Sequence, residues 1–303
     1  MVSLALVLSL LAIDHNAGSA GFDFLRITPG AREAAMGGAA VGSAESPLAF
    51  WYSPALAAHV PGQEAQAGYS SWVGGIHVGS IAYAQPLNDR QGIGAGLVYV
   101  NSGTMKRTDP LGNELGTFGV AFADLNLSGA HRLTDLVALG FGLHGLYGSI
   151  DTFFTVGLAG NFGAAFDIPV EGLSGLTAGV AARNVGYQVK AFQSGRDPMP
   201  IEFIAGLGFR PNPSLGLGLD VTKALDDRFH VRAGIEGWIG DIIALRAGYN
   251  TAGSDIKSGG GEDILAGVTT GFGIRHLGYQ LDYGFVPMGV LGMTHRISFS
   301  LSL

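Results

Sequence analysis

The feature that most constrains this chain is an alternation of apolar and polar residues that recurs through its C-terminal half. From Met293 to Leu303, every second residue is Met, His, Ile, Phe or Leu, and the residues between them are Thr, Arg and Ser. The same alternation runs through residues 215–222, 229–238 and 276–285. A period of two points successive side chains to opposite faces of a β-strand. These segments are therefore predicted to be strands with one oily face and one small or polar face.

The polar face of these strands consists of Gly, Ser, Thr and isolated charges. A soluble β-sandwich normally shows Lys and Glu on its outer face, but only 14% of this chain is charged, and 50 of its 303 residues are Gly. Small residues suit the crowded interior of a narrow barrel whose oily face meets lipid, and a closed barrel leaves no unpaired edge there. We therefore predict an all-β, transmembrane outer-membrane β-barrel of about 14 antiparallel strands over residues 63–303. It would lie in the outer membrane of a diderm bacterium, in contact with the lipid.

Segments of strand length account for the whole barrel region. They are predicted near residues 63–72, 76–87, 91–101, 119–132, 135–149, 154–167, 175–187, 200–211, 214–224, 228–239, 241–250, 263–274, 276–287 and 292–303. The longest connections, 102–118, 188–199 and 251–262, each follow an odd-numbered strand. Outer-membrane barrels have long extracellular loops and short periplasmic turns, so these three connections are predicted to be extracellular.

The chain begins with an apolar segment that is too short to span a bilayer as a helix. Val2–Ile13 is followed by Asp14 and then by the small residues of 16–20, whereas a spanning helix needs about 20 apolar residues. An apolar core followed by small residues is typical of an export signal. We predict that residues 1–20 are a cleaved signal peptide, with a buried N-terminal strand or a start codon placed too far downstream as alternatives.

Residues 21–62 lack the strand alternation and are predicted to form an N-terminal hatch that folds inward as a plug. Thr28–Gly42 favours a short helix interrupted by flexible Gly residues. A second compact piece, Leu48–Ala57, places aromatic residues between the turn-forming Pro47 and Pro54.

Several short motifs lie in the hatch and in the last strand. They are Phe24–Ile27, Gly30–Arg32, Ala35–Ala39, Phe50–Trp51, Pro54–Ala55 and Thr294–Ser298. With these motifs, the chain resembles the PorV/PorQ family of outer-membrane proteins, which is similar to the FadL-type barrels. The resemblance implies a 14-stranded barrel with a hatch and, in the best-known members, a role in type IX secretion of proteins with a C-terminal sorting domain. The hatch residues that it singles out are Arg32, Met36, Gly37, Gly38, Phe50, Trp51 and Pro54.

Charged residues of both signs fall on or near the predicted inner face of the barrel. They are Glu202, Arg210, Asp220, Arg232, Glu236, Arg246, Asp282 and Arg296. Such charges either pair and seal the interior or line a path for solutes. In the hatch, Arg32 is expected either to pair with Asp220 or Glu236 and lock the plug, or to be solvated at the periplasmic end.

Other chemistries find little support in the sequence. The chain has no Cys, which excludes disulfides and thiolate sites, and its net charge of −7 argues against a nucleic-acid partner. Gly140–Gly145 has the spacing of a dinucleotide fingerprint, and Ser254–Lys257 that of some acylating hydrolases, but the flanking elements that each needs are missing. The His residues are scattered singly, and Asp226–Asp227 indicates a hairpin turn rather than a calcium loop. We predict no metal, no cofactor and no catalytic residue.

Two functions therefore lead, and a third is weaker. The first is a PorV/PorQ-like noncatalytic barrel that serves protein secretion or surface attachment through its extracellular loops. The alternative is a FadL-like uptake channel for hydrophobic small molecules, in which the hatch moves and a break in a strand opens a lateral exit. An outer-membrane enzyme ranks last, because the sequence spacing assembles no nucleophile, base and orienting group.

Overall fold

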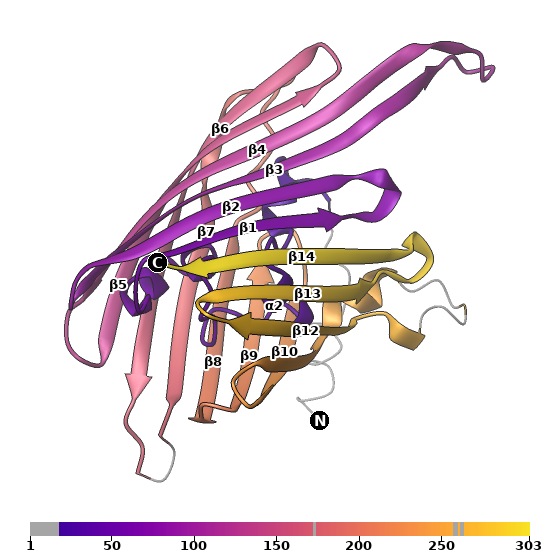
Figure 1. The fold of residues 1–303 in the computed structure, drawn as a ribbon. Helices are drawn as coiled ribbons and strands as arrows, with labels where there is room; N and C mark the ends of the chain where they lie inside the picture. Colours follow the sequence, from indigo (N-terminus) through magenta and orange to yellow (C-terminus); the bar gives the residue numbers. More distant parts are fainter. Residues whose placement is uncertain (1–17, 172–173, 257–259, 261–263) are drawn as a thin grey trace, which may run out of the picture.

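The chain folds into a single closed barrel of 14 antiparallel strands, as a computed structural model shows (Figure 1). The structure describes residues 18–171, 174–256, 260 and 264–303. The strands are β1 (Glu64–Ser71), β2 (His77–Asn88), β3 (Gln91–Thr108), β4 (Glu114–Arg132), β5 (Val137–Ile150), β6 (Phe153–Ile168), β7 (Leu176–Lys190), β8 (Glu202–Asn212), β9 (Leu215–Ala224), β10 (Phe229–Ile239), β11 (Ile243–Asn250), β12 (Val268–His276), β13 (Tyr279–Pro287) and β14 (Met293–Ser302). Each strand pairs with its neighbours in sequence, and β14 pairs with β1 to close the barrel. The predicted fold class is confirmed.

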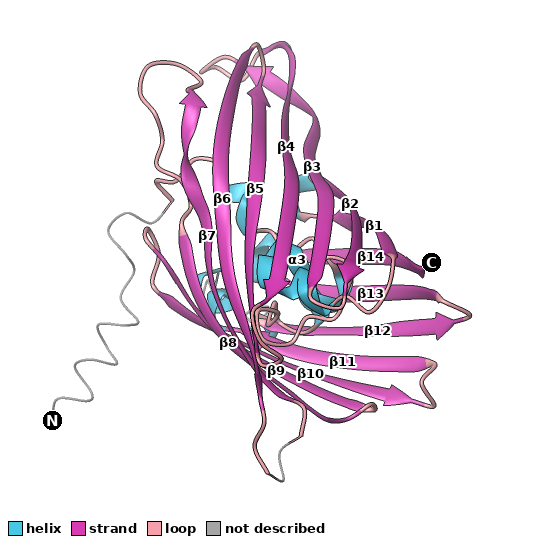
Figure 2. Cartoon of the chain, turned by 90° about the vertical axis from the view of Figure 1, so that its left-hand side faces the viewer, coloured by secondary structure: helices cyan, strands magenta, loops and turns pink. Residues whose placement is uncertain are grey.

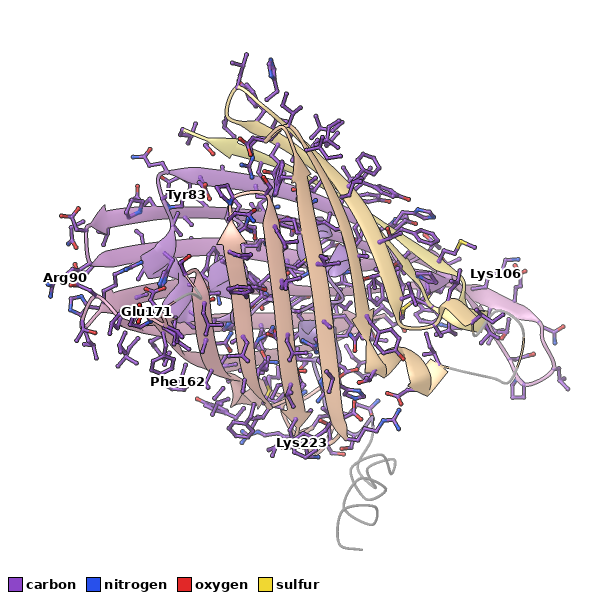
Figure 3. The ribbon with its side chains drawn as sticks, turned by 90° about the horizontal axis from the view of Figure 1, so that it is seen from below. Tyr83, Arg90, Lys106, Phe162, Glu171 and Lys223 are labelled. Carbon is purple, nitrogen blue, oxygen red and sulfur yellow. The ribbon has the colours of Figure 1, made fainter. Side chains whose placement is uncertain are left out.

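The alternation in the sequence becomes the two faces of the barrel wall. In β14, Ile297 and Phe299 are about half exposed, whereas Thr294 and Ser298 are fully buried. Outward-pointing apolar side chains such as Phe162 cover the exterior (Figure 3). A closed barrel with an apolar exterior is the form in which sheets cross the outer membrane, and the chain is a protein of that membrane. No helix in the described residues has the length and apolar character needed to cross a membrane.

The prediction that residues 102–118 form a long loop is wrong, because most of these residues belong to strands. β3 and β4 remain paired as far as Thr108 and Glu114, after a register shift that follows Asn101. The hairpin projects beyond its neighbours (Figure 1) and carries Lys106 to one extreme of the molecule (Figure 3). The alternation of the sequence is weak here because both faces of this hairpin are exposed, so nothing selects an oily side.

The N-terminal segment lies inside the barrel (Figure 2). Its elements are η1 (Asp23–Arg26), α2 (Ala31–Ala35), α3 (Ala49–Tyr52) and η2 (Pro54–His59). Short 3-10 turns elsewhere are η3 (Val73–Gly75), η4 (Thr251–Ile256) and η6 (Gly289–Leu291). Residues 1–17, which carry most of the predicted signal peptide, lie outside the described residues, so its cleavage stays a prediction.

Glycines on the inner face of the wall let the hatch approach the strands closely. A Cβ placed on Gly140 would lie 2.2 Å from the backbone nitrogen of Ala55, and one on Gly94 would lie 2.3 Å from the ring of Phe50. Both distances are shorter than any normal contact of a Cβ atom, so a larger residue would push the hatch away. The high Gly content of the chain is therefore partly a requirement of hatch packing.

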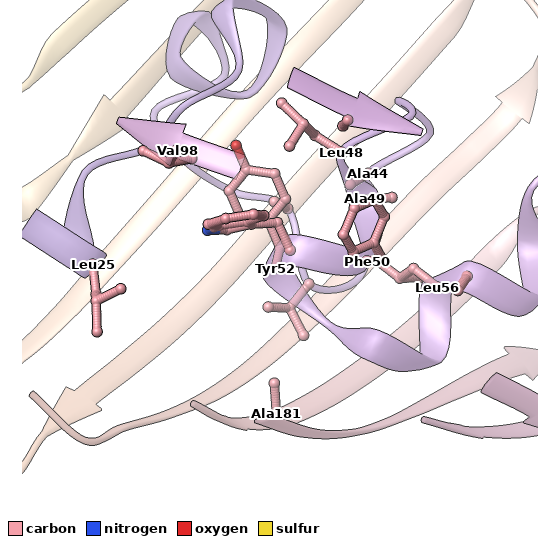
Figure 4. Packing of buried hydrophobic residues seen from close by; sticks show 14 of the residues in the cluster. Leu25, Ala44, Leu48, Ala49, Phe50, Tyr52, Leu56, Val98 and Ala181 are labelled. Atoms are coloured by element: carbon pink, nitrogen blue, oxygen red, sulfur yellow. The ribbon is translucent and has the colours of Figure 1, made fainter. Parts of the chain in front are cut away.

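The centre of the buried apolar cluster is formed by the hatch itself. Leu48, Phe50 and Trp51 are almost fully buried, together with Tyr52 and Leu56 (Figure 4). The inner faces of β2 to β8 add mostly Ala and Val to this cluster. The hatch thus supplies the large side chains, and the wall supplies the space for them.

Candidate functional site

The hatch is joined to the wall by a buried network of charges centred on Glu236. The Arg32 guanidinium of α2 donates to both carboxylate oxygens of Glu236, at 2.8 and 3.0 Å. Arg246 donates to Glu236 at 2.7 Å and to Asp282 at 2.7 Å, and Arg210 donates to Glu236 at 3.0 Å. Burial alone lowers the pKa of Arg32, but the nearby Glu236 carboxylate more than offsets this and raises the pKa above its usual range. Arg32 therefore stays charged and paired.

Asp220, the other acid considered as a partner for Arg32, binds the hatch backbone instead. Its carboxylate accepts hydrogen bonds from the amides of Ala40 at 2.7 Å and Val41 at 3.0 Å. The carboxylate thus satisfies backbone donors that would otherwise be buried without partners. Asp220 and Glu236 together hold two successive parts of the hatch to β9 and β10.

The remaining predicted inner charges lie in separate groups. Glu202 lies 3.6 Å from Arg183 and 3.8 Å from Arg26. The Arg296 side chain donates to the carbonyl of Thr28 and stacks over the ring of Trp72. Arg232 approaches Gly38, and its Nε has no hydrogen-bond partner among the described residues.

The other predicted hatch residues contact the wall closely. Gly37 and Gly38 have φ values of 70° and 83°, a conformation that favours glycine, and the Gly37 amide donates to Thr269 Oγ1 at 3.0 Å. A Cβ on Gly234 would overlap Met36, one on Gly96 would approach Trp51, and one on Gly163 would approach Pro54. These residues fix the position of the hatch, and their functional role stays a prediction.

One buried polar group in the lumen was not predicted. His144 Nδ1 lies 2.9 Å from both carboxylate oxygens of Asp124, its Nε2 lies 2.6 Å from the Asn126 amide nitrogen, and Trp51 packs edge-on against the ring. An Asp–His pair resembles part of a catalytic triad. Here Nε2 faces the amide nitrogen of Asn126 instead of a hydroxyl nucleophile. Sequence spacing could not reveal it, because the pairing of β4 with β5 creates it.

A cavity of about 720 Å³ separates the hatch from the wall at the end of the barrel that carries the short turns. Met36 and Leu56 of the hatch and Phe166 and Leu217 of the wall give it apolar surface, and Arg210 and Glu236 add polar groups. Short turns mark the periplasmic end of an outer-membrane barrel. A smaller cavity of about 160 Å³ lies at the opposite end, beside η4 and Arg26.

The wall contains a seam between β7 and β8. Their pairing runs from Leu176↔Phe209 to Arg183↔Glu202 and then stops, although β7 continues to Lys190. Residues 184–190 therefore have no strand on their β8 side, and the connection 191–201 runs beside them (Figure 2). Asn184 marks the break, with a positive φ of 60° that Asn tolerates better than most residues.

The connection seals the seam with few hydrogen bonds. Pro198 and Pro200 have no amide hydrogen, so this segment cannot form a regular ladder with β7. The Asn184 side chain donates to the carbonyl of Pro200 at 3.1 Å, and the Gln188 side chain accepts from the Asp197 amide at 2.8 Å. The seam is thus closed mainly by side chains.

The start of the hatch covers the seam from inside. The Gly21 amide donates to the carbonyl of Pro198 at 2.9 Å. Behind it, Phe22 and Phe24 pack edge-on, and Phe24 stacks on Phe122 with ring centroids 5.2 Å apart. These rings therefore pack on the inner faces of β4 and β6, and the Gly21 contact with Pro198 covers the seam itself.

Solved structures similar to this chain are outer-membrane channels. A ΔS2S3 mutant of TodX, a monoaromatic hydrocarbon channel, matches over 90% of this chain and 99% of its own, with a TM-score of 0.68 and 13% identity. The toluene transporter TodX of Pseudomonas putida matches with a TM-score of 0.60 and 14% identity, over 89% and 96% of the two chains. A FadL homologue of Pseudomonas aeruginosa matches with a TM-score of 0.55 and 13% identity, over 91% and 98%.

These likenesses show that the chain has the fold of the FadL-type outer-membrane barrels. No protein-family model and no curated protein sequence matches it. The FadL part of the predicted resemblance is confirmed at the level of fold, whereas the PorV/PorQ part is not supported by these neighbours.

Proposed function

We propose that this protein is a channel that takes hydrophobic small molecules across the outer membrane. The observation that carries the proposal is the seam between β7 and β8, where part of β7 has no partner strand and the start of the hatch covers the gap from inside. The other side of β7 is held to β6 by a backbone ladder as far as Lys190, whereas the seam is closed by the side chains of Asn184 and Gln188 and by the Gly21 amide. A local movement of η1 and residues 197–201 would connect the lumen with the lipid.

Two further observations support this function. The similar solved structures include hydrocarbon channels, and they favour the uptake function over the secretion function that the PorV/PorQ resemblance implied. The larger cavity, lined by apolar residues and the hatch, also matches the expectation for a transporter, whose binding pocket should be continuous with its hatch.

The decisive experiment locks the seam with a disulfide. The chain has no Cys, so the double variant Gln188→Cys/Asp197→Cys allows only one disulfide, between two positions whose side chains are in contact. Uptake of radiolabelled toluene is measured in cells that lack their own hydrocarbon channel. We expect uptake to fall to the level of cells without the protein when the bond is oxidised, and to return on reduction.

A matched control uses another hydrogen-bonded pair of side chains. Asn88→Cys/Gln91→Cys lies on the β2–β3 turn, away from the seam, and should leave uptake unchanged. If wild-type cells take up no more toluene than empty cells, the proposed function is wrong. If wild-type uptake is normal and the oxidised seam variant transports equally well, only the route through the seam is wrong.

A further inference from the structure

Three potential metal ligands converge at the end of the barrel opposite the short turns. Asp227 lies in the β9–β10 turn, His230 follows in β10, and Asp255 belongs to η4. His230 Nε2 lies 3.0 Å from Asp227 Oδ2 and 3.7 Å from Asp255 Oδ2, and one ligand atom from each residue lies within 4.8 Å of the other two. Ligand atoms bound to one metal ion at about 2.0–2.2 Å have comparable separations.

The second oxygen of each carboxylate is held by Arg228. The Arg228 amide donates to Asp227 Oδ1 at 2.7 Å, and its guanidinium donates to Asp255 Oδ1. Both Oδ2 atoms are left facing the imidazole of His230. Outer partners that fix the orientation of ligating side chains in this way are typical of metal sites.

The exposure of the group also fits a cation. The His230 side chain is 8% exposed, whereas those of Asp227 and Asp255 are 34% and 37% exposed. A bound ion would therefore have the imidazole behind it and an open position toward solvent.

We propose that Asp227, His230 and Asp255 bind a divalent metal ion of the zinc class. One imidazole nitrogen and two carboxylate oxygens form a three-residue set that leaves a position for water. The sequence analysis predicted no metal, because Asp255 meets the other two only through the fold. The proposal is independent of the transport function.

The position of the site gives the ion a mechanical role. It would join η4 to the β9–β10 turn, where the neighbouring Asp226 forms an ion pair with Arg26 of η1. η4 and Arg26 also line the smaller cavity. Metal binding would therefore stiffen the place where the start of the hatch meets the rim.

The test is titration calorimetry of Zn²⁺ into the chelator-treated, detergent-purified full chain. We expect one saturable site, an affinity at least about tenfold weaker in His230→Ala and in Asp255→Asn, and a wild-type unfolding temperature that rises with Zn²⁺. The control His276→Ala changes an exposed His at the opposite end of the barrel and should bind as wild type does.

Thermal unfolding without metal checks that the variants fold. If His230→Ala does not fold, Asp227→Asn provides another ligand variant. Absence of saturable Zn²⁺ binding to the wild type would overturn the proposal. Equal affinity in the folded ligand variants, or binding of Ca²⁺ but not of Zn²⁺, would overturn it as well.

Discussion

Glu236 is the residue on which the attachment of the hatch to the wall is centred. Its carboxylate accepts hydrogen bonds from Arg32, Arg210 and Arg246. Removing one partner of a buried ion pair is costly because the remaining charge stays buried. Glu236→Gln is expected to lower the free energy of unfolding by about 3 kcal/mol, measured by urea titration in detergent with Trp fluorescence.

Arg32→Ala should lower the free energy of unfolding by less than Glu236→Gln does, because Glu236 keeps its two other arginines. The same substitution should raise the leakage of small solutes through the barrel.

The control for Glu236→Gln is Glu114→Gln, which removes an exposed ion pair with Lys106. A loss of unfolding free energy below about 1 kcal/mol is expected there. Equal losses in Glu236→Gln and Glu114→Gln would contradict a central role for Glu236.

Tyr52 makes the stability of the hatch dependent on alkaline pH. Burial and the nearby Glu33 carboxylate raise the pKa of its hydroxyl well above the usual value of 10.0. Between pH 10 and the raised pKa of the folded protein, the unfolded chain loses the Tyr52 proton and the folded chain keeps it. Stability should therefore fall as the pH rises above 10, by up to about 1.4 kcal/mol per pH unit.

The measurement for Tyr52 is the free energy of unfolding at pH 9 and pH 11. Tyr52→Phe should lose part of the decrease between these pH values, whereas Tyr99→Phe, at an exposed position, should keep it. A decrease of the same size in Tyr52→Phe would show that other groups cause the pH dependence.

At the scale of the strands, β5 provides both a test and its control. Gly140→Ala places a Cβ 2.2 Å from the backbone of η2, whereas Gly145→Ala places one in open space on the outer face. Overpacking costs about 1–3 kcal/mol, so Gly140→Ala should destabilise the barrel and raise its conductance in planar bilayers as the hatch is displaced. Gly145→Ala should change neither, and a similar effect of both substitutions would exclude hatch contact as the cause.

The strands also show what the sequence could predict. The alternation predicted 14 strands because lipid outside and a crowded lumen inside select different residues at every second position. The β3–β4 hairpin beyond Asn101 was missed because neither of its faces meets the core. Pro198 and Pro200 offered a signal for the seam, but its position depends on which residues of β7 they adjoin. The same applies to Asp124 and His144, which meet only through strand pairing.

At the scale of the whole molecule, the hatch is held unevenly. Its middle part, from α2 to η2, is fixed by Glu236, Asp220 and the inner glycines. In contrast, η1 is held by Arg26, which pairs with Asp226 and lies near Glu202, beside the part of β7 that has no ladder to β8. Opening at the seam therefore requires fewer contacts to break than expulsion of the complete hatch. We expect the middle of the hatch to stay in place during transport.

A second disulfide separates these two movements. In Ser43→Cys/Gly218→Cys the two Cβ atoms would lie 3.2 Å apart, slightly closer than the separation of about 3.5–4.5 Å in disulfides, so the bond would tie the middle of the hatch to β9. The oxidised form should keep most of the toluene uptake of its reduced form, while the oxidised seam variant should not. Loss of uptake in both oxidised variants would mean that the complete hatch must move during transport. The bond between positions 43 and 218 lies far from the seam, so it could block passage only by holding the middle segment in a place that it must leave.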